Sequence, residues 1–204
     1  FNKPFATTTM DNGSAALDYA YITYRFGHKR TWEATLGKQL SVMGSFEKDI
    51  NPLYEYIFTD YLNGVYANIF LAGAQLSYKI NPKHSFGIQI HNTLNQAFDN
   101  HLKGNQFSTS GYQNSDLPIG GYVYWNGSFW DGRFKTKYSY NMAQFAHSYY
   151  THSISLGNKL QIGQHTAYLD LVYSHMGADF GLTSSRLLSI HDGLREGAFT
   201  MRKN

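Results

Sequence analysis

The chain has 204 residues, of which 15% are charged and 17% are aromatic, and its formal net charge is +3. Soluble domains usually carry about 25% charged residues, and so small a net charge gives no argument for nucleic acid as a partner. The chain has no cysteine, which excludes disulfides and thiolate metal sites, and its longest fully apolar run, residues 69–72, is far shorter than the roughly 18 residues of a membrane-spanning helix.

Alternation of apolar and polar side chains predicts eight β-strands after a loop at residues 1–14. The strands form four pairs, and each pair is joined by a short turn rich in Gly, Asn, Asp or Pro. The first pair covers residues 15–26 and the stretch that begins at Trp32, and the second covers 65–80 and 85–91. The third pair covers 119–130 and 134–141. The fourth covers 149–156 and, after a turn at 157–163, a strand that reaches residue 174.

This arrangement is typical of a transmembrane β-barrel. Such barrels have strands of about 9 to 11 residues, apolar outside and polar inside, with short turns at one rim and longer loops at the other. Closure leaves no backbone group unpaired in lipid. We therefore predict one all-β domain over residues 1–204, an antiparallel barrel of at least eight strands in the outer membrane of a Gram-negative bacterium. The alternative is a soluble β-sandwich or a lipocalin-like barrel.

Two stretches are predicted to be irregular. Residues 94–117 are rich in Asn, Gly, Ser and Gln and indicate a long loop, and residues 186–204 indicate a loop followed by an unfinished strand. A complete outer-membrane barrel is expected to end in an aromatic residue, whereas this chain ends in Met-Arg-Lys-Asn. We therefore expect the chain to be part of a larger barrel.

The strand that begins at Trp32 loses its alternation at Gly37, and a long aromatic and acidic segment follows. We predict that residues 43–64 fold into the lumen as a constriction loop. There the aromatic side chains would anchor the loop and the carboxylates would narrow the path, and the residues concerned are Glu47, Asp49, Tyr54, Tyr56 and Asp60. The alternative is an extracellular loop that caps the barrel.

The inward parity of the strands selects candidate pore-lining residues, namely Arg25, Glu33, Gln75, Lys79, Gln89, His91, Lys135, Lys137 and Asp170. Lys135 and Lys137 would meet anions directly, unless they only keep a wet wall soluble. Lys38 falls on the lipid-facing parity, where a charge costs about 2 to 4 kcal/mol. We therefore predict a bulge at Gly37 that turns Lys38 inward and adds it to the pore lining.

Catalysis finds little support in the sequence. The nine histidines are scattered without metal-ligand spacing, and no nucleophile–base pattern is present. We predict no catalytic residue, no metal and no cofactor, and therefore a protein that is not an enzyme.

Several short motifs resemble the Bacteroidetes-type branch of the phosphate-selective porin family, most clearly over residues 17–95. They are Leu36-Gly37-Lys38-Gln39, then Gly44, Glu47 and Asp49, Asn51-Pro52, Tyr54 and Tyr56 with the run to Leu62, the turn at Asn81-Pro82-Lys83, and His91-Asn92. The resemblance implies an outer-membrane channel, general or anion-preferring, that is a homotrimer of barrels with about sixteen strands.

We therefore predict a porin that lets small hydrophilic solutes or ions diffuse passively through a water-filled lumen, with outer-membrane lipid around it. The competing hypothesis is a non-channel barrel with a structural or adhesive role. The acidic character of the predicted constriction argues against a dedicated phosphate channel.

Overall fold

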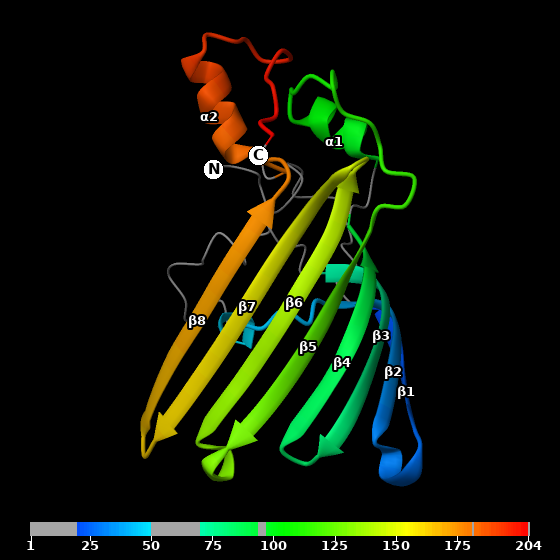
Figure 1. Cartoon of the computed structure of the whole chain (residues 1–204), viewed down its shortest axis with the longest axis vertical. Helices are drawn as coiled ribbons and strands as arrows, with labels where there is room; N and C mark the ends of the chain where they lie inside the picture. Colours follow the sequence, from blue (N-terminus) through cyan, green and yellow to red (C-terminus); the bar gives the residue numbers. More distant parts are fainter. Residues whose placement is uncertain (1–19, 50–69, 94–96, 181, 204) are drawn as a thin grey trace, which may run out of the picture.

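A computed structural model describes residues 20–49, 70–93, 97–180 and 182–203, and its centre is one eight-stranded antiparallel sheet. Each strand pairs with the strands before and after it in the chain, and within the described residues β1 and β8 are the two edges (Figure 1). The prediction of an all-β antiparallel fold is confirmed. The strands are β1 (Ala20–Phe26), β2 (Trp32–Leu40), β3 (Phe70–Asn81), β4 (His84–Asn92), β5 (Ile119–Phe129), β6 (Phe134–Ala146), β7 (Tyr149–Ile162) and β8 (His165–Met176).

The two faces of the sheet differ in chemistry because the alternation is kept in register across neighbouring strands. Leu36 pairs with Ala74, which in turn pairs with Ile90, so apolar positions fall beside one another on one face. We call this the outer face, and it exposes large apolar side chains such as Ile22, Leu36, Ile88, Ile154 and Leu171. The opposite, inner face carries mainly Ser, Thr, Asn, Gln and Tyr, and it is buried over much of β4 to β7 and mostly exposed on β1 and β8.

Four short connections lie at one rim of the sheet, the lower rim in Figure 1, and the two-residue connection between β6 and β7 lies at the upper rim. The four at the lower rim are residues 27–31, 82–83, 130–133 and 163–164, and they include the short helices η1 (His28–Arg30) and η4 (Trp130–Gly132). Trp32 packs against Phe26 and Tyr78 near this rim, with ring centroids 6.2 and 4.6 Å apart. Aromatic rings in this position are typical of a membrane–water interface.

Two strands are longer than the sequence indicates. β7 continues through the predicted turn at residues 157–163 and ends at Ile162, and β6 continues to Ala146, which leaves only residues 147–148 before β7. The prediction of a turn at Gly157-Asn158 is wrong because Gly157 pairs with Lys137 on one side and Asp170 on the other. Ladder hydrogen bonds on both sides outweigh the local turn preference of Gly and Asn.

The predicted bulge at Gly37 is also wrong. The registers of β2 with β1 and with β3 run without a shift through Gly37 and Lys38. Gly37 has φ +126°, and a Cβ there would lie 2.2 Å from the backbone oxygen of Ala20. Glycine thus absorbs the distortion without an extra residue, and Lys38 stays on the opposite face from Gln39, which is buried on the inner face.

The upper rim carries a second core, which we call the rim cap. It contains α1 (Phe98–Gly104) and α2 (Thr183–His191), where the sequence indicated only loops and an unfinished strand. Both helices are too short to be stable alone. α2 is held by hydrogen bonds that its buried Ser185 and Ser189 accept from the amides of residues 202 and 200, whereas α1 packs Phe98 and Leu102 into a hydrophobic core that the sequence pattern does not reveal. Its buried residues are Phe98, Leu102, Phe107, Ala146, Ala178, Phe180, Leu182, Phe199 and Met201.

The rim cap is joined to the sheet by aromatic and charged contacts. Tyr112 donates a hydrogen bond to the backbone oxygen of Met201, and the Lys203 ammonium lies 4.9 Å from the centre of the Tyr112 ring and 5.3 Å from that of Tyr149 at the start of β7. Neither of the helices in the described part of the chain is long and apolar enough to span a membrane.

Candidate functional site

The chain leaves β2 after Leu40 and crosses the inner face of the sheet. We call residues 41–49 the crossing segment; it ends in the short helix η2 (Glu47–Asp49) and is the cyan trace behind the strands in Figure 1. The Val42 amide donates to Gln89 Oε1 of β4 at 3.2 Å, and the Gly44 amide donates to Ser139 Oγ of β6 at 2.8 Å. Both partners lie well inside their strands, so the segment crosses the sheet away from its rims.

The crossing segment passes four strands in few residues, although it makes a tight turn at Gly44, where the Ser45 amide donates to the Met43 oxygen at 3.0 Å. Between Val42 and Phe46 it passes from contact with β4 to contact with β8, a path of roughly 19 Å across four strand spacings. Four residue steps of extended chain reach only about 14 Å. Two effects cover the difference between the path of roughly 19 Å and the reach of about 14 Å. Side chains of the wall extend toward the segment, and the curl of the sheet shortens the distance between β4 and β8 on its concave side.

Glycines let the segment approach the wall closely. A Cβ on Gly44 would lie 2.4 Å from the Lys137 oxygen and 2.5 Å from the Ser155 oxygen, and a Cβ on Gly157 would lie 2.9 Å from the Gly44 oxygen. Real Cβ atoms do not approach backbone oxygens so closely, so both positions require glycine for this packing. Gly44 and its neighbours Met43 and Ser45 are buried against the wall.

Asp170 of β8 receives the end of the crossing segment. Its Oδ2 accepts hydrogen bonds from Ser45 Oγ at 2.6 Å, from the Phe46 amide at 2.8 Å and from the Glu47 amide at 3.1 Å. Its Oδ1 is buried without a hydrogen-bond partner among the described residues. The Asp170 carboxylate, which the sequence predicts to line the pore, therefore binds the crossing segment of the same chain.

Beyond Asp170 the inner face carries a group of lysines. Lys137 forms an ion pair with Asp49 of the crossing segment and lies 4.8 Å from the centre of the Phe46 ring. Lys135 stands directly opposite Lys159 in the register of β6 and β7, and Lys159 lies 5.2 Å from the centre of the Tyr168 ring. Like charges directly opposite each other are unfavourable, so this group is suited to an anion or a carboxylate nearby.

The other predicted pore-lining residues are distributed along the inner face. Arg25 and Glu33 form an ion pair between β1 and β2, and Lys79 is exposed near the short-turn rim. Gln75 donates to Tyr124 Oη at 2.8 Å. These residues lie on the predicted face but outside the crossing segment's contacts.

Two residues predicted to line the pore are covered instead. Gln89 is 1% exposed and His91 is 6% exposed. The Gln89 side chain accepts from the Val42 amide and donates to the Leu40 oxygen, so it fixes the start of the crossing segment. Of the predicted constriction residues, Glu47 and Asp49 lie in the crossing segment, whereas Tyr54, Tyr56 and Asp60 lie outside the described residues.

Sequence reasoning missed three groups that build this site. Lys159 was assigned to a turn, although the parity of Ser155 and Gly157 continues to it and could have placed it on the inner face. Ser139 shares the parity of Lys135 and Lys137, but nothing in the sequence shows it as the acceptor for the Gly44 amide. No local signal identifies Gly157 as the glycine that faces Gly44.

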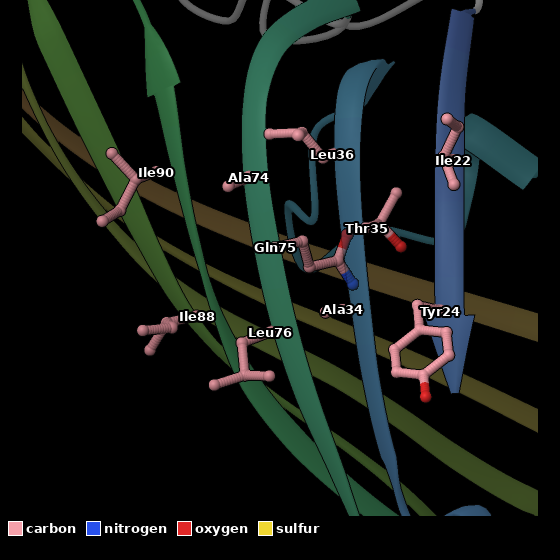
Figure 2. Close-up of a pocket in the computed structure, with 10 residues that line it drawn as sticks. All are labelled: Ile22, Tyr24, Ala34, Thr35, Leu36, Ala74, Gln75, Leu76, Ile88 and Ile90. Carbon is pink, nitrogen blue, oxygen red and sulfur yellow. The ribbon is translucent and has the colours of Figure 1, made fainter. Parts of the chain in front are cut away.

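A shallow groove lies on the outer face over β1 to β4 (Figure 2). Ala34 and Ala74 form its floor, and larger side chains such as Ile22, Leu76 and Ile90 border it. Because it lies on the opposite side of the sheet from the crossing segment, it is not part of the solute path. Within the described residues no group of three His, Asp or Glu side chains could hold a metal ion.

A meandering antiparallel sheet with an apolar outer face, a polar inner face and a chain segment laid across that inner face defines the outer-membrane porin class. The family description "Phosphate-selective porin O and P" matches residues 2–186. The chain therefore belongs to the phosphate-selective porin family. No match was found among curated proteins or among solved structures.

Membership gives the protein its general function. The chain belongs to a channel of the Gram-negative outer membrane through which solutes diffuse passively, and its family is one of transport channels rather than enzymes. The Bacteroidetes-type branch and a total of about sixteen strands stay predictions.

Proposed function

We propose that the crossing segment is the constriction of this porin and that small hydrophilic solutes and ions pass beside it. The observation that carries the proposal is its attachment to β4, β6 and β8 on the polar face, far from either rim. A segment held only at the rim would cap the barrel instead. Passage past it requires no catalytic step.

Charges of both signs lie close together where the crossing segment meets the inner face of the sheet. Lys135, Lys137 and Lys159 belong to the wall, whereas Glu47 and Asp49 belong to the crossing segment. Pore selectivity follows from such rings of charge and from diameter. Because Asp49 is paired with Lys137, the wall attracts anions less than its lysines alone would, which supports a general channel rather than one dedicated to phosphate.

The test is the Asp49→Asn substitution in the full-length protein reconstituted in planar bilayers. A unit charge about 5 Å from an ion is worth about 0.8 kcal/mol in water, which is about fourfold in the permeability of each ion and opposite in sign for anion and cation. Removing the charge should therefore raise the anion-to-cation permeability ratio by about fifteenfold. The reversal potential in a salt gradient measures this ratio, and the effect should shrink as salt rises.

Asp131→Asn is the matched control, because Asp131 is an exposed carboxylate in the short turn η4 that pairs with Lys83. It should leave the reversal potential unchanged. A wild-type protein that gives no stepwise conductance would refute the channel proposal and leave the structural or adhesive role. Equal effects of the two substitutions would refute the assignment of Asp49 to the constriction.

We also propose that the protein is a homotrimer whose subunits meet over the groove of β1 to β4. Small residues such as Ala34 and Ala74 allow close approach of a partner's side chains, and the surrounding outer face is apolar. The mass of the protein in detergent should be that of three chains, and Ala74→Trp, which fills the groove, should reduce the trimer fraction. A monomeric wild type would refute this assembly.

A further inference from the structure

We propose that Asp170 is a positioning residue that sets the width of the pore by holding the crossing segment, and that it does not act on the solute. This inference rests on the proposed function, because it assigns the constriction its anchor. The sequence pattern alone places Asp170 among the lining residues that solutes would meet.

The contacts of Asp170 support the anchoring role. Three donors from consecutive residues, Ser45, Phe46 and Glu47, converge on one carboxylate oxygen. Ser45 Oγ also accepts from the Glu47 amide at 3.0 Å, which fixes the hydroxyl between the amide and the carboxylate. The chain direction at the start of η2 is therefore set by a single side chain of β8.

The other described contacts that hold the crossing segment to the sheet are of weaker types than the hydrogen bonds to Asp170. Gln89 and Ser139 accept from backbone amides as neutral groups, and hydrogen bonds to an ionised acceptor are roughly twice as strong as neutral ones. The Asp49–Lys137 ion pair is half-exposed on the Asp49 side, and exposed pairs contribute little. Asp170 is thus the strongest attachment of the crossing segment among the described residues.

The position of Asp170 explains how it reaches the segment. Its register partner on β7 is Gly157, and the segment backbone lies over that glycine. A side chain at position 157 would hold the segment away from the wall, whereas its absence brings the Ser45 hydroxyl within 2.6 Å of the carboxylate. The glycine provides the space and the aspartate provides the bond.

The decisive experiment compares pore width with ion preference for Asp170→Asn in the full-length porin in planar bilayers. Neutral polymers of graded size measure the width, and the reversal potential measures ion preference. An amide oxygen is a weaker acceptor than a carboxylate, so the segment should detach more often. We expect the polymer size cut-off to rise and the conductance to increase.

Ser45→Ala is the second variant, because it removes one donor and leaves the charge of the wall unchanged. It should move the size cut-off in the same direction by a smaller step, with no change in reversal potential. Asp131→Asn again serves as the control for the loss of a remote carboxylate, and it should change neither quantity.

The outcomes separate the hypotheses. If Asp170→Asn alters the reversal potential but not the size cut-off, Asp170 lines the pore and the positioning role is overturned. If Asp170→Asn does not assemble, an unchanged cut-off in Ser45→Ala overturns the role equally. Failure of the proposed function is a different result, namely a wild type without conductance.

Discussion

Substitution of Gly44 by alanine is the most direct test of how the crossing segment is seated. The new Cβ would lie 2.4 Å from the Lys137 oxygen, 2.5 Å from the Ser155 oxygen and 2.9 Å from the Ser139 nitrogen. All three are backbone atoms of β6 and β7, which are paired on both sides and cannot retreat. The segment must therefore lift by about 1 Å to restore ordinary contact.

The cost can be worked from these contacts. Overpacking of this kind costs typically 1–3 kcal/mol, and lifting also lengthens the 2.8 Å hydrogen bond from the Gly44 amide to Ser139, which is worth about 1 kcal/mol. We take about 2 kcal/mol as the loss, since part of the strain is relieved when the segment moves. This corresponds to roughly a thirtyfold shift of the equilibrium between attached and detached segment.

The assay is single-channel recording with neutral polymers of graded size. Gly44→Ala should admit larger polymers than the wild type and should add fluctuations between two conductance levels. Gly104→Ala is the matched control, because no described atom outside its chain neighbours and its own helix backbone lies within 4 Å of the position of its Cβ, and it should behave as the wild type does. A Gly44→Ala channel with the wild-type cut-off would refute the inferred backbone contact.

Two further predictions concern the rim cap. The Arg186 guanidinium lies 5.8 Å and 5.6 Å from the centres of the Phe107 and Phe199 rings, so Arg186→Gln should destabilise the cap by about 1 kcal/mol and speed its proteolysis while conductance stays unchanged. The pKa of Tyr112 is raised to about 12, mainly by burial and secondly by the nearby Tyr149. The contribution of Tyr112 to the stability of the rim cap is therefore complete below about pH 10, the ordinary tyrosine pKa, and is lost as pH rises through 12. Protease sensitivity of the cap between pH 10 and 12 measures this loss.

Controls for the rim cap come from the same region. Arg195→Gln changes an exposed arginine just after α2 and should leave proteolysis unchanged; an equal effect would contradict the role given to the Arg186 contacts. Tyr112→Phe removes the titrating hydroxyl, so its alkaline loss of stability should be smaller. If both proteins respond identically between pH 10 and 12, the pH dependence arises elsewhere.

Strand positions were predictable because their signal is local. Alternation in residues such as Phe86, Ile88 and Ile90 follows directly from the two-residue period of a strand between lipid and water. Turn chemistry at Asp131-Gly132 located a hairpin for the same reason, since both residues adopt positive φ. Strand ends were less predictable, as Gly157 shows, because pairing with two neighbours decides whether the ladder continues.

The helices of the rim cap could not be predicted from their sequences. α2 begins after Leu182, which has φ +62° and gives no side-chain hydrogen bond to the helix; the Ser185 amide in the first turn donates instead to Asp179 Oδ2 at 2.6 Å. Its contacts come from residues outside the helix, since Arg186 lies over the rings of Phe107 and Phe199 and donates a hydrogen bond to the Asn105 oxygen. A helix of nine residues held by such contacts leaves little local signal.

The sequence by itself determined that this chain forms eight antiparallel strands with one face for lipid and one for water, because side-chain alternation and turn residues act within a few positions. It also marked the stretch after β2 as an interruption. Only the tertiary structure decided where that interruption goes, because the attachment depends on a glycine contact between positions 44 and 157 and on a carboxylate at position 170. These partners lie more than 100 residues away in the chain, and only the pairing of the strands brings them beneath the crossing segment.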